Sequence, residues 1–132
     1  MPSLISSRFA AIVLLTAAVQ PALADRLIER YSARLSAQDH FNSNGERLSS
    51  PAAIIRQDRA NYHKFGKRDD EDEDDNYFAE ASNRALLEKL IARGRTTKSA
   101  AHSVVNGTPV IEVQIYRAKG GDDYVDVTVF SD

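Results

Sequence analysis

The chain contains no cysteine and no tryptophan. The absence of cysteine excludes disulfides, thiolate metal ligands and lipid attachment through a thiol. Small exported domains often depend on disulfides, so the core of this protein must close by packing alone. Long hydrophobic runs are also absent: the longest, Phe9–Val19, is about half of the roughly 20 residues that a membrane-spanning helix needs. We therefore expect no membrane span.

The same short apolar run is typical of a secretory signal peptide. Arg8 precedes it, Pro21 follows it, and a small-x-small triplet ending at Ala24 offers a site for signal peptidase. We predict that residues 1–24 are cleaved and that the mature chain begins at Asp25. Export without cysteine fits a bacterial periplasm or culture medium, so the predicted location is periplasmic or extracellular.

Residues 25–132 are long enough for one domain and too short for two. A Ser50-Pro51 pair and Gly66 predict the start and the end of a first helix. A leucine-rich stripe predicts a second helix, from near residue 76 to residue 94, with Glu80, Arg84 and Glu88 facing water. A third, shorter helix is expected over 97–105.

The end of the chain changes from helical to alternating periodicity. Residues 108–117 and 124–130 alternate apolar and polar side chains around a glycine turn, which predicts an antiparallel hairpin with one buried face. Residues 25–48 favour a short helix or strand followed by a turn at Asn44-Gly45. The predicted fold class is α+β, with about three helices packed on a small antiparallel sheet that contains the C-terminal hairpin.

Charge is distributed unevenly along the predicted mature chain. Residues 25–68 hold nine basic and five acidic residues, a net charge of +4, whereas residues 69–132 hold seven basic and fourteen acidic residues, a net charge of −7. Such asymmetry can mark a partner surface, or it can let two parts of one chain attract each other. Because the mature chain is acidic as a whole, we do not expect it to bind nucleic acid.

The most unusual segment is the unbroken acidic run at residues 69–75. A twelve-residue calcium loop started at its first residue would place Glu80 at the last ligand position, but Asp74 stands where that loop needs glycine. We therefore expect a solvated loop between two helices. A looser divalent-cation site, most simply for calcium, is the alternative, with the ligands Asp69, Glu71, Glu73, Asp75 and Glu80.

A basic stripe is predicted on the first helix. Arg56, Arg59 and His63 recur at helical spacing, and Lys67 could continue the stripe beyond the helix end. This stripe could hold an anionic partner, or it could attract the acidic run that follows it in the chain. In the second case we expect exposed ion pairs that contribute about 0–1 kcal/mol each.

Catalytic chemistry has little support in the sequence. The three histidines do not have the spacing of a helical metal site, and no GxSxG elbow presents a nucleophile. His63 and His40 are the candidates for a small histidine-dependent hydrolase, which is the weaker functional alternative. The favoured hypothesis is an exported, non-catalytic protein that binds another protein or an anionic envelope component. An open sheet edge or aromatic residues on the hairpin could also pair with a second copy of the chain.

Overall fold

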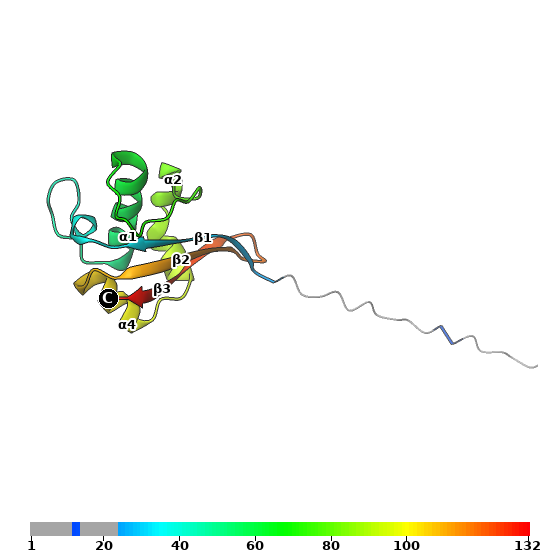
Figure 1. The fold of residues 1–132 in the computed structure, drawn as a ribbon. Helices are drawn as coiled ribbons and strands as arrows, with labels where there is room; N and C mark the ends of the chain where they lie inside the picture. Colours follow the sequence, from blue (N-terminus) through cyan, green and yellow to red (C-terminus); the bar gives the residue numbers. More distant parts are fainter. Residues whose placement is uncertain (1–11, 14–23) are drawn as a thin grey trace, which may run out of the picture.

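The computed structural model describes residues 12–13 and 24–132 (Figure 1). The predicted signal peptide, residues 1–24, lies almost wholly outside the described residues, and its cleavage stays a prediction. No helix in residues 24–132 combines the length and the apolar character that crossing a membrane requires. The strands are β1 (Arg26–Arg34), β2 (Val110–Arg117) and β3 (Asp123–Ser131). The helices are η1 (Ala37–His40), α1 (Pro51–Ala60), η2 (Asn61–Phe65), α2 (Ala81–Arg84), α3 (Leu87–Arg93) and α4 (Lys98–Asn106).

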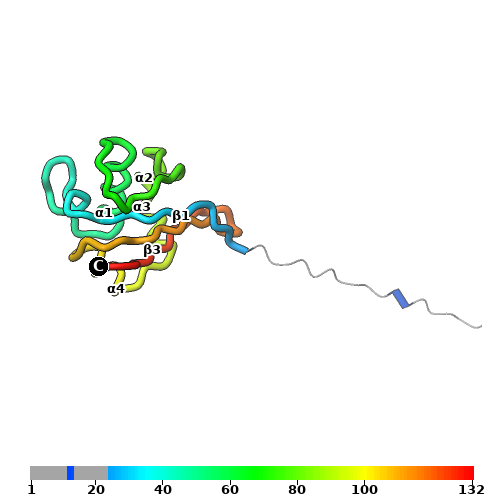
Figure 2. The backbone as a smooth tube through the Cα atoms, viewed as in Figure 1, coloured from blue at the N-terminus to red at the C-terminus, as the bar shows by residue number. Residues whose placement is uncertain are grey.

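The α+β fold class is confirmed. The three strands form an antiparallel sheet in the order β1-β2-β3, and β2 and β3 are the predicted C-terminal hairpin. Buried and half-buried residues alternate along β2, because the helices cover one face of the sheet. Figures 1 and 2 show that the hairpin tip and the start of β1 extend together beyond the helices. The core combines side chains from all three strands, α1, α3 and α4, among them Tyr31, Ile54, Leu90, Val104, Val113 and Val125.

The first helix begins and ends where the sequence predicts. The Ser50 hydroxyl accepts a hydrogen bond from the Ala53 N–H, and Pro51 occupies the first helical position. The helix changes to π geometry at Asn61 and ends at Gly66, which has φ of 66°. Because this backbone conformation is costly for residues with a Cβ, Gly66 ends the helix with little strain.

The predicted second helix is wrong in its extent. Residues 76–80 form turns, and the helical part is divided into α2 and α3. The side chain of Arg84 does not face water: its guanidinium is buried and donates to the carbonyl oxygens of Phe78 and Ala79, 2.8 and 3.1 Å away. These bonds stabilise the preceding turn. The predicted exposed row of Glu80, Arg84 and Glu88 therefore does not form, because Arg84 faces inwards.

Candidate functional site

The basic stripe predicted on α1 is not a single exposed surface. Arg59 has 0% exposure and lies inside the protein, where its Nη1 donates to Asp75 Oδ1 at 2.8 Å and its Nε donates to Asp58 Oδ2 at 2.8 Å. His63 is 10% exposed at its side chain, and its Nε2 lies 2.7 Å from the same Asp75 oxygen. Arg59 and His63 therefore turn towards the acidic run, and only Arg56 and Lys67 of the predicted stripe are exposed.

Two aromatic rings make the burial of Arg59 possible. The centre of its guanidinium lies 4.1 Å from the Tyr31 ring and 4.5 Å from the Tyr62 ring. A guanidinium is weakly hydrated and stacks on aromatic faces, so arginine tolerates such a site better than lysine does. Nη1 also donates to the Glu73 carbonyl at 3.0 Å, which ties the acidic run to the helix. The predicted attraction between stripe and acidic run is thus observed, but through buried groups.

The predicted acidic loop is largely exposed, at Asp70, Glu71, Glu73 and Asp74. It is not a free loop, because several of its side chains bond to β1. β1 is an edge strand, and two of its outward N–H groups donate to acidic side chains. The Ser32 N–H donates to Glu73 Oε1 at 2.8 Å, and the Arg34 N–H donates to Asp72 Oδ1 at 3.0 Å. The Glu73 N–H in turn donates to the Ser32 carbonyl at 2.8 Å. The run replaces a neighbouring strand and protects the edge of the sheet.

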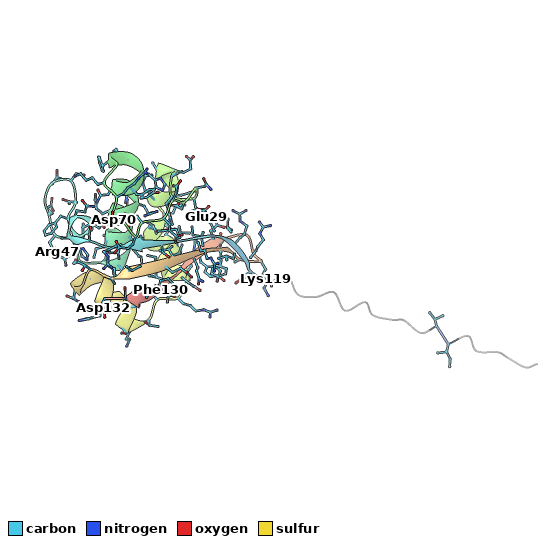
Figure 3. All side chains as sticks on the ribbon, in the orientation of Figure 1. Glu29, Arg47, Asp70, Lys119, Phe130 and Asp132 are labelled. Atoms are coloured by element: carbon cyan, nitrogen blue, oxygen red, sulfur yellow. The ribbon has the colours of Figure 1, made fainter. Side chains whose placement is uncertain are left out.

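Both ends of the acidic run are also held in place by hydrogen bonds and ion pairs. Asp75 is buried, and its Oδ2 accepts a hydrogen bond from the Phe78 N–H at 2.6 Å, which begins the turn before α2. Glu29, labelled in Figure 3, accepts from the Asn76 N–H further along β1. At the other end, the Arg34 side chain pairs with Glu71 at 2.9 Å. Most of the acidic run therefore has a structural partner within the chain.

The predicted cation ligands do not converge on one point. Glu71 pairs with Arg34, Glu73 bonds to the β1 backbone, and Asp75 bonds to Arg59 and His63. Glu80 is exposed and precedes α2 as its N-cap residue. Among the described residues, Asp69 instead lies with two carboxylates from other segments, Asp39 and Asp58, with one oxygen from each within 4.8 Å of the others.

The two histidines proposed for hydrolysis are held by structural contacts. His40 is buried, and its ring nitrogens each lie 2.8 Å from a carbonyl oxygen, of Ser36 and of Val104. These contacts join η1 to α4. His63 bonds to Asp75, as described above. Within residues 24–132, neither ring forms a hydrogen bond with a serine or threonine hydroxyl.

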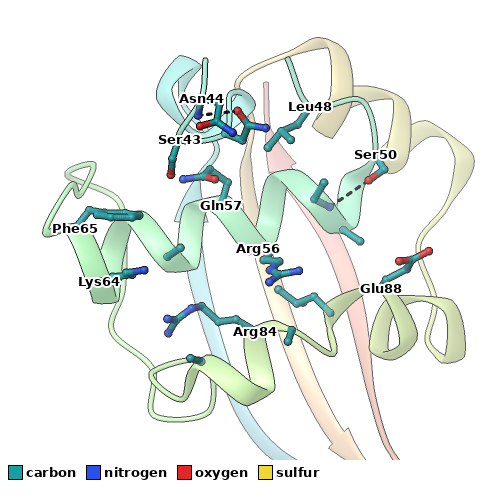
Figure 4. A pocket seen from close by; sticks show the side chains of 17 residues that line it. Ser43, Asn44, Leu48, Ser50, Arg56, Gln57, Lys64, Phe65, Arg84 and Glu88 are labelled. Atoms are coloured by element: carbon teal, nitrogen blue, oxygen red, sulfur yellow. Dashed lines mark hydrogen bonds between the residues drawn. The ribbon is translucent and has the colours of Figure 1, made fainter. Parts of the chain in front are cut away.

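The exposed basic residues Arg56, Lys64 and Lys67 line a surface groove. A cavity of about 570 Å³ lies along α1, η2, α2 and the start of α3, and a hollow of about 400 Å³ adjoins it. Figure 4 shows Arg56 of α1 and Lys64 of η2 on the side that faces Arg84 of α2. Lys67 lines the adjoining hollow. We call the surface formed by Arg56, Lys64, Phe65 and Lys67 the basic groove.

The basic groove combines free positive charge with an apolar centre. Phe65 is 46% exposed and lines both parts of the groove. Among the residues that the structure describes, none forms an ion pair with the side chain of Arg56, Lys64 or Lys67. Alanines at positions 52, 53, 60, 81 and 85 line the wall between the helices and leave it shallow. Among the described residues, Glu88 is the one acidic residue in the lining, so the charge of the groove favours a negatively charged ligand.

Sequence reasoning missed Lys64 and Phe65 as parts of this surface. Both lie in the final turn of the helix, where π geometry changes the angular spacing from that of an α-helix. The aromatic residues predicted on the hairpin also do not form one patch. Tyr116 and Tyr124 stack with ring centroids 5.1 Å apart, whereas Phe130, labelled in Figure 3, is 59% exposed near the chain end.

No family model, no curated protein and no solved structure matches this chain.

Proposed function

We propose that this protein is an exported, non-catalytic binding protein whose basic groove holds an acidic segment of a partner protein. The observation that carries the proposal is that Arg56, Lys64 and Lys67 line the groove together with the exposed ring of Phe65 and have no ion-pair partner in the described part of the chain. Export is supported by the sequence pattern of residues 1–24 alone.

Charge and shape together favour a peptide segment as the ligand. Arginine and lysine side chains bind carboxylates, and an exposed aromatic ring adds apolar contact area at little entropic cost. The lining comes from the loop at residues 42–50, α1, η2, α2 and the start of α3, so a ligand that contacts all of it spans several segments. Binding is also favoured over histidine chemistry because His40 and His63 are engaged in contacts that join parts of the fold.

The proposal can be tested with a fluorescein-labelled peptide in which glutamates flank one phenylalanine. We expect fluorescence anisotropy to show saturable binding that weakens as salt is raised, since screening reduces each ion pair. Replacement of Arg56, Lys64 and Lys67 by alanine should weaken binding about tenfold, because three exposed ion pairs of this kind together contribute on the order of 1–2 kcal/mol.

A matched control removes three exposed lysines elsewhere, through Lys89→Ala, Lys98→Ala and Lys119→Ala. This variant has the same net charge as the groove variant and should bind the peptide like the unmodified protein. Equal weakening in both variants would show that only overall charge matters and would contradict the proposal. Binding to anionic lipid vesicles but not to the peptide would contradict the choice of a protein partner.

A further inference from the structure

The side chains of three aspartates from separate segments lie close together. Asp39 belongs to η1, Asp58 to α1, and Asp69 begins the acidic run. One carboxylate oxygen from each lies within 4.8 Å of the other two. Asp39 and Asp58 are each 1% exposed, and Asp69 is half-buried. Like charges held this close in a buried place repel one another unless something neutralises them.

The hydrogen bonds around the three aspartates leave two buried oxygens unsatisfied. Asp58 uses one oxygen for Arg59, and its Oδ1 has no hydrogen-bond donor among the described residues. Asp69 Oδ2 is buried and likewise lacks a donor in that part of the chain. A buried acceptor without a partner costs free energy, so such atoms point to a ligand that the protein binds.

The position of Asp39 is fixed before any ligand binds. Its Oδ1 accepts a hydrogen bond from Asn61 Nδ2 at 2.9 Å, and its Oδ2 accepts one from the Ser36 N–H at 3.0 Å. Burial raises the pKa of Asp39 to about 6, these two hydrogen bonds lower it, and the charges of Asp69 and Asp72 raise it. Arg59 compensates the charge of Asp58, whereas no cationic side chain in the described part of the chain forms an ion pair with Asp39 or Asp69.

We propose that Asp39, Asp58 and Asp69 form a calcium-binding site that joins η1, α1 and the start of the acidic run. All three ligands supply oxygen, which calcium and magnesium prefer. Calcium accepts about six to eight oxygens in a flexible geometry, whereas magnesium requires a near-ideal octahedron. Three carboxylates fixed by separate segments, with one oxygen from each within 4.8 Å of the others, therefore suit calcium better, and water would complete the coordination.

The site differs from the one predicted from the sequence, which used residues of the acidic run alone. Only Asp69 is common to both. The site shares no residue with the basic groove, although Asn61, which donates to Asp39, also lines the hollow beside Lys67. Calcium binding and peptide binding are therefore tested with different variants. Calcium at this position would fix the start of the acidic run and help to hold its remaining residues against β1.

The test is a calorimetric titration of the chelator-treated full chain with calcium chloride at physiological salt, together with thermal unfolding. We expect saturable heat and a higher Tm in calcium. Asp69→Asn is the informative variant, because the Asp69 side chain makes no hydrogen bond within the described residues and its loss should leave the fold intact. It should weaken calcium binding at least tenfold.

Asp70→Asn is the matched control, since Asp70 is the exposed neighbour and the change in charge is identical. This variant should bind calcium within twofold of the unmodified protein. Absence of heat and of a Tm shift at millimolar calcium would overturn the proposal, and so would equal binding by the Asp69 and Asp70 variants. A response to magnesium without a response to calcium would overturn the assignment of the ion.

Discussion

Replacement of Arg59 by methionine is expected to destabilise the protein by about 3–5 kcal/mol, because it breaks a buried ion pair and leaves its partners behind. Methionine fills a similar space between the Tyr31 and Tyr62 rings but donates no hydrogen bond. Asp58 and Asp75, which are 1% and 0% exposed at their side chains, would then be buried without their cation. Urea unfolding followed by circular dichroism measures the change in the free energy of unfolding.

The control for this prediction is Arg56→Met, one turn earlier on α1. Arg56 is exposed and has no ion-pair partner within the described residues, so its loss should change stability by no more than about 0.5 kcal/mol. A similar, small effect in both variants would mean that Arg59 is solvated and that the buried cluster does not form.

Replacement of Gly94 by alanine is also expected to destabilise the protein, because the added Cβ would overlap the backbone of β3. Gly94 ends α3 where that helix meets β3. A Cβ at this position would overlap the carbonyl oxygen of Val125 and lie 2.5 Å from its carbonyl carbon. Both atoms belong to the backbone of a paired strand and cannot move aside alone. We expect a loss of about 3 kcal/mol, at the upper end of the usual cost of overpacking.

Gly120→Ala serves as the comparison for Gly94→Ala. Gly120 lies in the turn between β2 and β3, where an added Cβ meets nothing within 4 Å, and its φ is not positive. This substitution should leave the midpoint of thermal unfolding nearly unchanged. If Gly94→Ala is tolerated equally well, α3 does not approach β3 as closely as the structure shows.

The features that the sequence predicted correctly are those with local causes. The Ser50 cap, the Gly66 helix end and the alternating pattern of β2 and β3 depend on neighbouring residues, and all are observed. The second helix, predicted from its leucine-rich stripe to begin near residue 76, begins only at residue 81. Asp75 instead caps a turn through Phe78, which delays the helix until residue 81.

The site was harder to predict because contacts between distant segments decide which of its side chains are buried and which are exposed. Helical spacing places Arg56, Arg59 and His63 near one another on α1, but it does not say which of them meets the core. Arg59 is buried because Tyr31 from β1 and Asp75 from the acidic run lie beside it. The meeting of Asp39 with Asp58 and Asp69 likewise depends on three segments whose sequences carry no common motif.

The central claim is that the acidic run is a built part of the fold, held along the edge of β1 by hydrogen bonds to its backbone. Native-state hydrogen exchange of the backbone amides tests it most directly. The amides of Ser32 and Arg34 point away from β2 and are protected only if Glu73 and Asp72 accept their hydrogen bonds. We predict slow exchange at Ser32, Arg34 and Glu73. Exchange of these three amides at the rate of unstructured peptide, while the rest of the sheet stays protected, would contradict the account.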